Sequence, residues 1–406
     1  MINKKAFSNG LIVLAAILIV AVVYRCKNPK IESTHDNPVV LATHENGEQF
    51  VGSETCMECH ADMYKSHLKT AHFNTSAVAN AEKVKGSFED GDNILDLDQV
   101  EFKMLSEGDS LYQHTRLKNR TSKVAPAKFD MVIGSGVRGQ SYGTWENDKL
   151  FQLQTSYYAP TDSWVNSPGF PLYYDNPRPI RDACLKCHVT FAKSYESSRG
   201  NQFDKEKMIY GVDCERCHRP SAKHVDYHRK NPEAKVSKFM MPLGSLPRQE
   251  RLDVCAQCHS GLRERILKGN SFSFLSGEIL DEYVQNAHQV PSKATLDVHG
   301  NQYGLLIESE CFKKTEMMDC STCHDPHENQ RGKVENFNGK CISCHSSGLV
   351  VCAADESEVN HMSNNCIACH MPVSPSKSMT VQLNEKDSLE TSFYIRTHLI
   401  AIYPEP

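Results

Sequence analysis

The chain has 406 residues, of which 23 % are charged, and its formal net charge is -5. This balance excludes a disordered chain and a typical nucleic-acid-binding protein, which is basic, and a single long apolar run excludes a polytopic membrane protein. The unusual feature is the presence of 17 cysteines and 19 histidines. So many cysteines exceed what core packing uses, yet they fall short of a disulfide-dense mini-protein.

The N-terminal residues 1–25 are predicted to be a signal segment or membrane anchor. Two lysines precede an apolar run at Leu11–Tyr24, which is the order of charged and apolar segments in exported proteins. Because no small-residue cleavage site follows, an uncleaved anchor is favoured over a lipidated Cys26 and over a cleaved signal. All three alternatives export the chain to the periplasmic side of the cell envelope. Residues 26–50 are predicted to be a polar linker.

Fourteen of the 17 cysteines form the pattern C-x-x-C-H, which occurs seven times. The cysteines are Cys56, Cys59, Cys184, Cys187, Cys214, Cys217, Cys255, Cys258, Cys320, Cys323, Cys341, Cys344, Cys366 and Cys369. The histidines that follow them are His60, His188, His218, His259, His324, His345 and His370. In c-type haem attachment, two thiols bond to the porphyrin and the next histidine ligates the iron. Zinc or redox C-x-x-C pairs do not require that histidine, so we predict seven covalently attached haems c.

Two further cysteines, Cys311 and Cys352, lie among the last three motifs. They are either free buried thiols or a disulfide, since an exported protein permits both. The sequence leaves these two alternatives open.

The first two motifs are separated by 128 residues, whereas the later gaps are between 21 and 65 residues. Three short β-prone runs occupy this gap, at residues 129–134, 139–145 and 150–158, and Glu146–Asp148 is predicted to be a hairpin turn. We therefore predict a β-rich insert at residues 85–180. Its expected role is structural, as a cover for neighbouring haems, rather than docking of a partner.

The haem-binding parts of the chain are predicted to be a first haem segment at residues 51–84 and a six-haem region at 181–380. Short helices are expected around each motif, and porphyrin rings are expected to supply much of the buried apolar surface. The predicted fold class is thus a mainly α and irregular multihaem cytochrome c fold with a β-rich insert. Residues 381–406 are predicted to be a C-terminal tail that supplies a distal histidine.

Twelve histidines remain after the seven proximal ones. His35 and His44 lie in the linker and are expected to be solvated. The other ten are His67, His72, His114, His224, His228, His288, His299, His327, His361 and His398. Ten candidates for seven distal positions favour haems with two axial histidines, which lack an open site and serve electron transfer.

Three of these candidates are assigned from their place in the chain. His327 follows His324 by three residues, so it cannot easily reach the far side of the same iron and is expected to ligate a neighbouring haem. His361 stands before the last motif and His398 stands after it, and both are predicted to be distal ligands. The seventh distal position stays open between His67, His114, His228 and His288.

Three stretches resemble the multihaem cytochromes of the c-552/c-554 type, which are related to hydroxylamine oxidoreductase and pentahaem nitrite reductase. They are Cys56 to His72 with Tyr64 and Thr70, Gly211-Val-Asp-Cys-Glu-Arg-Cys-His218 with His224, and Cys366-Ile-Ala-Cys-His-Met-Pro372. The resemblance implies that His72, His224 and His299 are distal ligands. It implies no particular reaction, because pentahaem nitrite reductase uses C-x-x-C-K at its catalytic haem and all seven motifs here end in histidine.

The predicted function is electron transfer between redox proteins, or from a quinone-linked donor, at the cell envelope. The alternative is an oxidoreductase in which one haem has an open coordination site and acts on a small nitrogen or sulfur compound. Sensing is disfavoured, because seven haems greatly exceed what a sensor needs.

Overall fold

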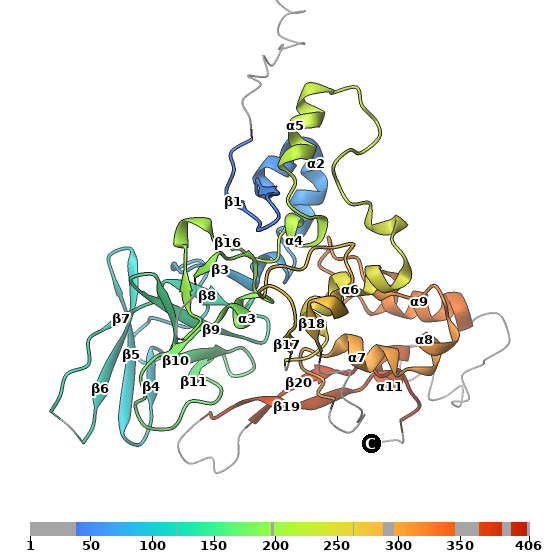
Figure 1. The fold of residues 1–406 in the computed structure, drawn as a ribbon. Helices are drawn as coiled ribbons and strands as arrows, with labels where there is room; N and C mark the ends of the chain where they lie inside the picture. Colours follow the sequence, from blue (N-terminus) through green and yellow to red (C-terminus); the bar gives the residue numbers. More distant parts are fainter. Residues whose placement is uncertain are drawn as a thin grey trace, which may run out of the picture.

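A computed structural model describes residues 38–119, 121–195, 199–262, 264–286, 296–345, 365–383 and 391–403. The structure is 27 % helical and 26 % strand (Figure 1). The prediction of a mainly α fold is therefore wrong. The physical reason is that short extended segments between the motifs pair with each other over long distances in the chain, which a local sequence pattern does not reveal.

A four-stranded antiparallel sheet lies at one edge of the molecule, in the order β4 (Ile94–Asp96), β5 (Val100–Glu107), β6 (Ser110–Leu117) and β7 (Ala127–Lys128). In β5, buried Val100, Phe102 and Met104 alternate with more exposed polar residues. This period of two places one face of the sheet on a core and the other in solvent.

An eight-stranded sheet lies next to it. Its strands are β3 (Ser76–Val78), β8 (Met131–Ile133), β9 (Gly139–Glu146), β10 (Lys149–Tyr158), β11 (Ser163–Asn166), β12 (Arg178–Pro179), β14 (Ser194–Tyr195) and β15 (Gln202–Phe203). The predicted turn between β9 and β10 is confirmed, and Asn147 adopts a φ of 59° there, which asparagine tolerates in tight hairpins.

The aromatic core of this β-rich part is formed by Phe129, Tyr142 and Trp164. Their ring centroids lie 4.9 Å (Phe129–Tyr142) and 5.4 Å (Tyr142–Trp164) apart, and all three side chains are buried. Burial of one such side chain stabilises a fold by about 2 kcal/mol. No residue of a C-x-x-C-H motif belongs to this cluster, so this part of the fold does not depend on haem for its core.

Helices and turns dominate the rest of the described chain. The helices are α2 (Ser53–His67), α3 (Asp182–Leu185), α4 (Cys214–His218), α5 (Ala222–Lys230), α6 (Arg248–His259), α7 (Gln302–Ile307), α8 (Glu310–Lys314), α9 (Val334–His345) and α11 (Cys366–His370). The short 3-10 turns are η1 (Phe73–Thr75), η2 (Lys205–Lys207), η3 (Leu243–Ser245), η4 (Leu280–Glu282) and η7 (Cys320–Thr322). In Figure 1, α2 and α5 lie together at one end, and α6 to α9 and α11 lie opposite the large sheets.

Four antiparallel pairs connect these helices. They are β1 (Ala42–Thr43) with β2 (Gln49–Phe50), β13 (Val189–Phe191) with β16 (Ile209–Tyr210), β17 (Arg265–Ile266) with β18 (Val284–Gln285), and β19 (Val373–Val381) with β20 (Thr391–Arg396). The last hairpin packs Phe393 against Tyr158 of β10 at 4.9 Å. The C-terminal part of the chain is thereby attached to the β-rich part.

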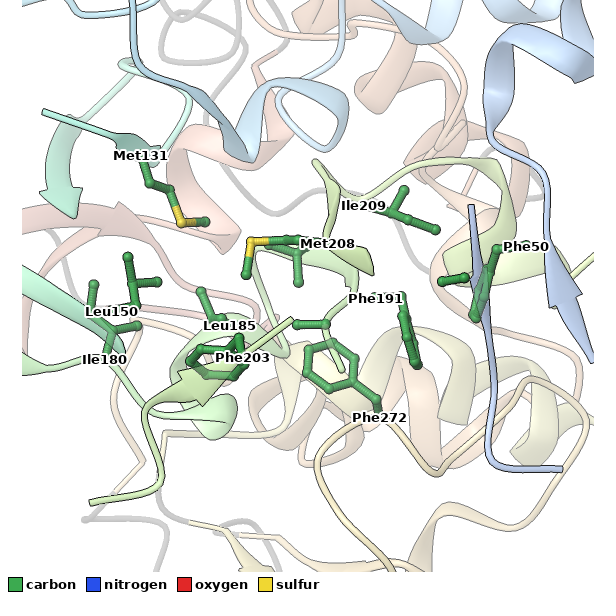
Figure 2. Close-up of a cluster of buried hydrophobic side chains, with 13 residues drawn as sticks. Phe50, Met131, Leu150, Ile180, Leu185, Phe191, Phe203, Met208, Ile209 and Phe272 are labelled. Atoms are coloured by element: carbon green, nitrogen blue, oxygen red, sulfur yellow. The ribbon is translucent and has the colours of Figure 1, made fainter. Parts of the chain in front are cut away.

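A second hydrophobic cluster joins the two halves (Figure 2). Phe191 lies between Phe50 at 4.8 Å and Phe272 at 5.8 Å, measured between ring centroids. Leu185, which lies between the cysteines of the second motif, belongs to the same cluster. The cluster therefore couples a predicted haem-attachment motif to both the large sheet and the N-terminal hairpin.

One residue of the predicted linker, His44, is not solvated. His44 is only 5 % exposed, and its Nε2 lies 3.0 Å from the carbonyl oxygen of Phe272. The expectation that His44 is solvated is therefore wrong, because the turn after β1 places its ring against the distant residue Phe272. The predicted anchor at residues 1–25, Cys26 and His35 lie outside the described residues, and within the described ranges no helix is long and apolar enough to cross a membrane.

Candidate haem-binding site

All seven predicted attachment motifs are placed in a helix or a single helical turn. The first lies in α2, the second at α3, the third in α4, the fourth at the end of α6, the fifth at η7, the sixth at the end of α9 and the seventh in α11. Helical spacing puts residues three apart on the same face. The two thiols of each motif can therefore reach one porphyrin edge, with the histidine directly after them.

The chain uses local capping to form these very short helices. Asp213, Asp319 and Asn365 each precede a motif and accept hydrogen bonds from its first backbone N–H groups, which would otherwise stay unsatisfied. Before the third motif, Gly211 has a φ of 69°, and a Cβ atom there would lie 2.3 Å from the carbonyl oxygen of Phe73. This close approach explains the glycine in the Gly-Val-Asp-Cys stretch.

The motifs lie against each other in pairs. Cys214 lies close enough to Cys56, Cys187 to Cys258, and Cys255 to Cys320, for the second thiol of each pair to raise the pKa of the first. These contacts join the first motif to the third, the second to the fourth, and the fourth to the fifth. All 15 described cysteines are free thiols, so none of the 14 motif cysteines is consumed by a disulfide.

Three predicted distal histidines face proximal ones. The ring centroids of His72 and His259 lie 6.2 Å apart, with 69° between the ring planes. Those of His218 and His327 lie 6.0 Å apart at 20°. Those of His324 and His398 lie 6.2 Å apart at 28°.

These separations suit two imidazoles on opposite sides of one metal ion. An imidazole nitrogen binds a metal at about 2 Å, and its ring centroid lies about 1 Å further out, so two such rings are about 6 Å apart. Direct packing of aromatic rings covers the same range, so the distance alone does not assign ligands. The assignment rests on this distance together with the proximal position of one member of each pair.

The electrostatics of these pairs favour neutral rings. Burial, followed by the facing His259, lowers the pKa of His72 to about 4. Burial and His327 lower the pKa of His218 to about 4, and burial and His324 lower the pKa of His398 to about 4. At neutral pH these rings carry no charge, which is the form that ligates a metal.

Several proximal histidines are also oriented through the other ring nitrogen. Nδ1 of His188 lies 2.9 Å from Thr75 Oγ1, Nδ1 of His259 lies 2.9 Å from Gln302 Oε1, and Nδ1 of His370 lies 2.9 Å from the carbonyl oxygen of Ala401. A hydrogen bond at Nδ1 fixes the ring and leaves Nε2 for a metal. The residues present therefore fit the chemistry of haem ligation.

Two other predicted distal histidines lie near proximal ones without a ring pair. Nδ1 of His224 lies 2.8 Å from the carbonyl oxygen of Lys238. A positive charge on His224, or on His60, would lower the pKa of His218, so both rings lie near it. The charged form of His299 would lower the pKa of His188 in the same way, although burial is the larger cause. Both are thus placed beside the motifs.

The candidates for the open seventh position differ in their surroundings. His67 is buried, with Nε2 3.1 Å from the carbonyl oxygen of Val212 and Nδ1 3.5 Å from Thr70 Oγ1. His114 is paired with Glu107 on the exposed sheet, whereas the rings of His228 and His224 pack at a tilt of 51° with 4.6 Å between their centroids. His228 also accepts a hydrogen bond at Nε2, from the backbone N–H of Lys238 at 3.4 Å. All three rings have local contacts, and the seventh position stays open among the candidates.

Three residues named in the predictions cannot be compared with the structure. His288, His361 and Cys352 lie outside the described residues. Cys311 is a free thiol whose pKa is raised by burial, and its pairing with Cys352 stays untested.

Sequence reasoning missed the charged residues between the motif cysteines. Lys186 in the second motif and Glu215 and Arg216 in the third are all buried. Lys186 Nζ lies 2.7 Å from Glu264 Oε2, just after the fourth motif. The available signal was the presence of charged spacers inside C-x-x-C, since charged residues are almost never fully buried unless they are paired.

Asp297 is a further missed residue, and it secures the loop that carries His299. Its carboxylate accepts hydrogen bonds from Ser376 and Ser378 hydroxyls and from the backbone of Lys377 and Ser378 in β19. Burial opposes ionisation, but these bonds, led by Ser378, lower the pKa of Asp297 to about 2. The His299 loop is therefore held against the C-terminal hairpin.

Comparison with known proteins identifies the region around the second and third motifs. Residues 174–219 match the family model of cytochrome c554 and c-prime. This segment is similar to that family. The fold is similar to that of the outer cell wall cytochrome OcwA, with a TM-score of 0.53 and 15 % identity over 86 % of this chain and 79 % of that one.

A second solved structure, an undecahaem cytochrome from the S-layer of Carboxydothermus ferrireducens, aligns with 86 % of this chain and 53 % of its own at 17 % identity. Its TM-score of 0.41 is too low to show a shared fold. A search of curated proteins found no match. The match to the family model and the C-x-x-C-H motifs support a multihaem c-type cytochrome, whereas the wider relation to hydroxylamine oxidoreductase and nitrite reductase stays a prediction.

Proposed function

We propose that the chain is a heptahaem c-type cytochrome that transfers electrons through closely packed haems with two axial histidines. The observation that carries the proposal is the set of three histidine pairs whose ring centroids lie 6.0–6.2 Å apart. In each pair one member follows a C-x-x-C motif and the other comes from a different part of the chain. Haem c supplies one-electron redox chemistry when it is bound.

The residues of this chain would hold the haems and set their spacing. The proposed axial pairs are His259 with His72, His218 with His327, His324 with His398, His188 with His299 and His60 with His224. His361 stays a candidate for one of the last two motifs. Because His324 and His327 are separated by only three residues, one short segment would ligate two haems and keep them close.

The thiol contacts indicate which haems would lie next to each other. They join the first motif to the third and connect the second, fourth and fifth motifs. The sixth and seventh motifs lie together, since the backbone N–H of Cys366 donates to Asn338 of α9 at 3.1 Å. We expect electrons to cross the molecule between the α2 end and the α11 end.

Export to the cell envelope is part of the proposal. The similar structure is described as an outer cell wall cytochrome, and residues 1–25 have the pattern of an export segment. The proposed partners are redox proteins or a quinone-linked donor, and the N-terminal segment is proposed to anchor the chain to the membrane.

The test is to produce the full chain with a c-type haem maturation system. Mass spectrometry should show the mass of the polypeptide plus seven haems, and EPR of the oxidised protein should show low-spin iron. A chain with fewer attached haems contradicts the count. A high-spin iron that reacts with a small nitrogen or sulfur compound supports the alternative enzyme function instead.

A further inference from the structure

Arg216, the second spacer residue of the third motif, is a cation buried without a counter-charge. Arg216 is only 8 % exposed. Nη2 donates to the carbonyl oxygen of Lys186 at 3.2 Å, and the guanidinium carbon lies 5.4 Å from the ring centroid of Phe272. Nε has no hydrogen-bond partner, and no carboxylate of the described residues forms an ion pair with this side chain.

The acidic neighbour Glu215 does not supply the missing charge contact. Its carboxylate accepts hydrogen bonds from the backbone N–H groups of Val51 and Gly52 at 3.1 and 2.7 Å. It also accepts from the N–H and hydroxyl of Ser221 at 2.8 and 2.7 Å. Glu215 thus faces the start of α2, whereas Arg216 faces the second motif.

Three attachment motifs converge at the Arg216 guanidinium. The carbonyl oxygen of Lys186 that it binds lies between the two cysteines of the second motif. The same oxygen lies 3.6 Å from the Cys258 thiol of the fourth motif. Arg216 itself lies between the two cysteines of the third motif, so three haem edges would meet around one buried positive charge.

A matched pair of charges lies at the same place. The Lys186 and Glu264 side chains, which are 2 % and 11 % exposed, form an ion pair of 2.7 Å. This pair is electrically neutral as a unit, whereas Arg216 is not. Variants of Arg216 and of the Lys186–Glu264 pair can therefore distinguish the effect of a net buried charge on the haems from the effect of a buried polar contact.

We infer that Arg216 is a tuning residue that raises the reduction potentials of the haems held by the second, third and fourth motifs. The inference rests on the proposed function. Reduction adds one electron to a ferric haem and makes it ferrous, with no bond or proton exchanged. A nearby buried cation stabilises the added negative charge, because the interior screens it less than water does. Electrons would therefore collect at this junction.

The experiment is a spectroelectrochemical titration of the full-length holoprotein and four variants. In Arg216→Gln, at least one haem should show about a tenfold lower ferrous-to-ferric ratio at a fixed applied potential, which is about 59 mV for a one-electron couple. Arg216→Lys keeps the charge and should stay near the wild type. Glu264→Gln leaves the positive charge of Lys186 without its partner and should raise the haem reduction potentials, which is the opposite direction. The double variant Lys186→Met with Glu264→Gln removes both charges of the neutral pair and should change the reduction potentials least.

The signs of the shifts decide the inference. An unchanged titration for Arg216→Gln overturns it, and so do shifts of the same sign in Arg216→Gln and Glu264→Gln, because these indicate a structural role. If Arg216→Gln fails to retain seven haems by mass, Glu264→Gln and Arg216→Lys decide the outcome by the same signs. Wild-type protein without covalent haem would instead contradict the proposed function.

Discussion

The pairing of His327 with His218 leads to a direct prediction. Replacement of His327 by alanine removes the ring that lies 6.0 Å from His218. The His327 side chain is 33 % exposed, and its Nδ1 contacts the exposed Asp325 at 3.2 Å. The loss of such an exposed contact costs about 0.5 kcal/mol, so the fold should persist while one iron loses its sixth ligand.

The expected result is the binding of one additional carbon monoxide per chain in the reduced protein. The oxidised protein should gain one high-spin iron in EPR, and the remaining haems should keep their low-spin signals. The measurement is a carbon monoxide titration followed by the Soret band, with haem content determined by mass. Wild-type protein titrated in parallel provides the baseline.

His67 provides a matched control because its ring centroid lies 6.5 Å from that of His327. Its Nε2 is engaged with the carbonyl oxygen of Val212 at 3.1 Å. His67→Ala should therefore bind no additional carbon monoxide. The reasoning is refuted if His327→Ala binds none, or if His67→Ala binds the additional equivalent.

Three other predictions follow from the described contacts. The pKa of Asp297 is about 2, below its unfolded value. Its stabilisation of the His299 loop is therefore present above pH 4 and is lost as the pH falls toward about 2. In an acid titration, the low-spin spectrum of the wild type should change over this pH range, and that of Asp297→Asn should not. Gly211→Ala should destabilise the protein by about 2 kcal/mol or more in denaturant titrations, because the new Cβ meets the carbonyl oxygen of Phe73 at a positive φ. Chain produced without haem should keep a protease-resistant fragment that spans residues 84–164, since that core contains no motif residue; complete degradation would contradict this.

Part of the fold was predictable because it is encoded locally. Strands β9 and β10 and the turn at Asn147 follow from alternating β-prone residues and a turn residue in one continuous stretch. The two-stranded pairs between the motifs were not predictable in this way. Strands β13 and β16, for example, are two or three residues long and exist only because chain folding brings residues 189–191 and 209–210 together.

The candidate site shows the same division. The sequence by itself determined the attachment chemistry, because two thiols and a histidine within five residues suffice to define a C-x-x-C-H motif. Only the tertiary structure decided which histidines face each other, since His72 and His259, or His324 and His398, come from distant parts of the chain. It also decided that Arg216 is buried without a carboxylate partner. Burial and counter-charge depend on long-range packing, and no local pattern specifies them.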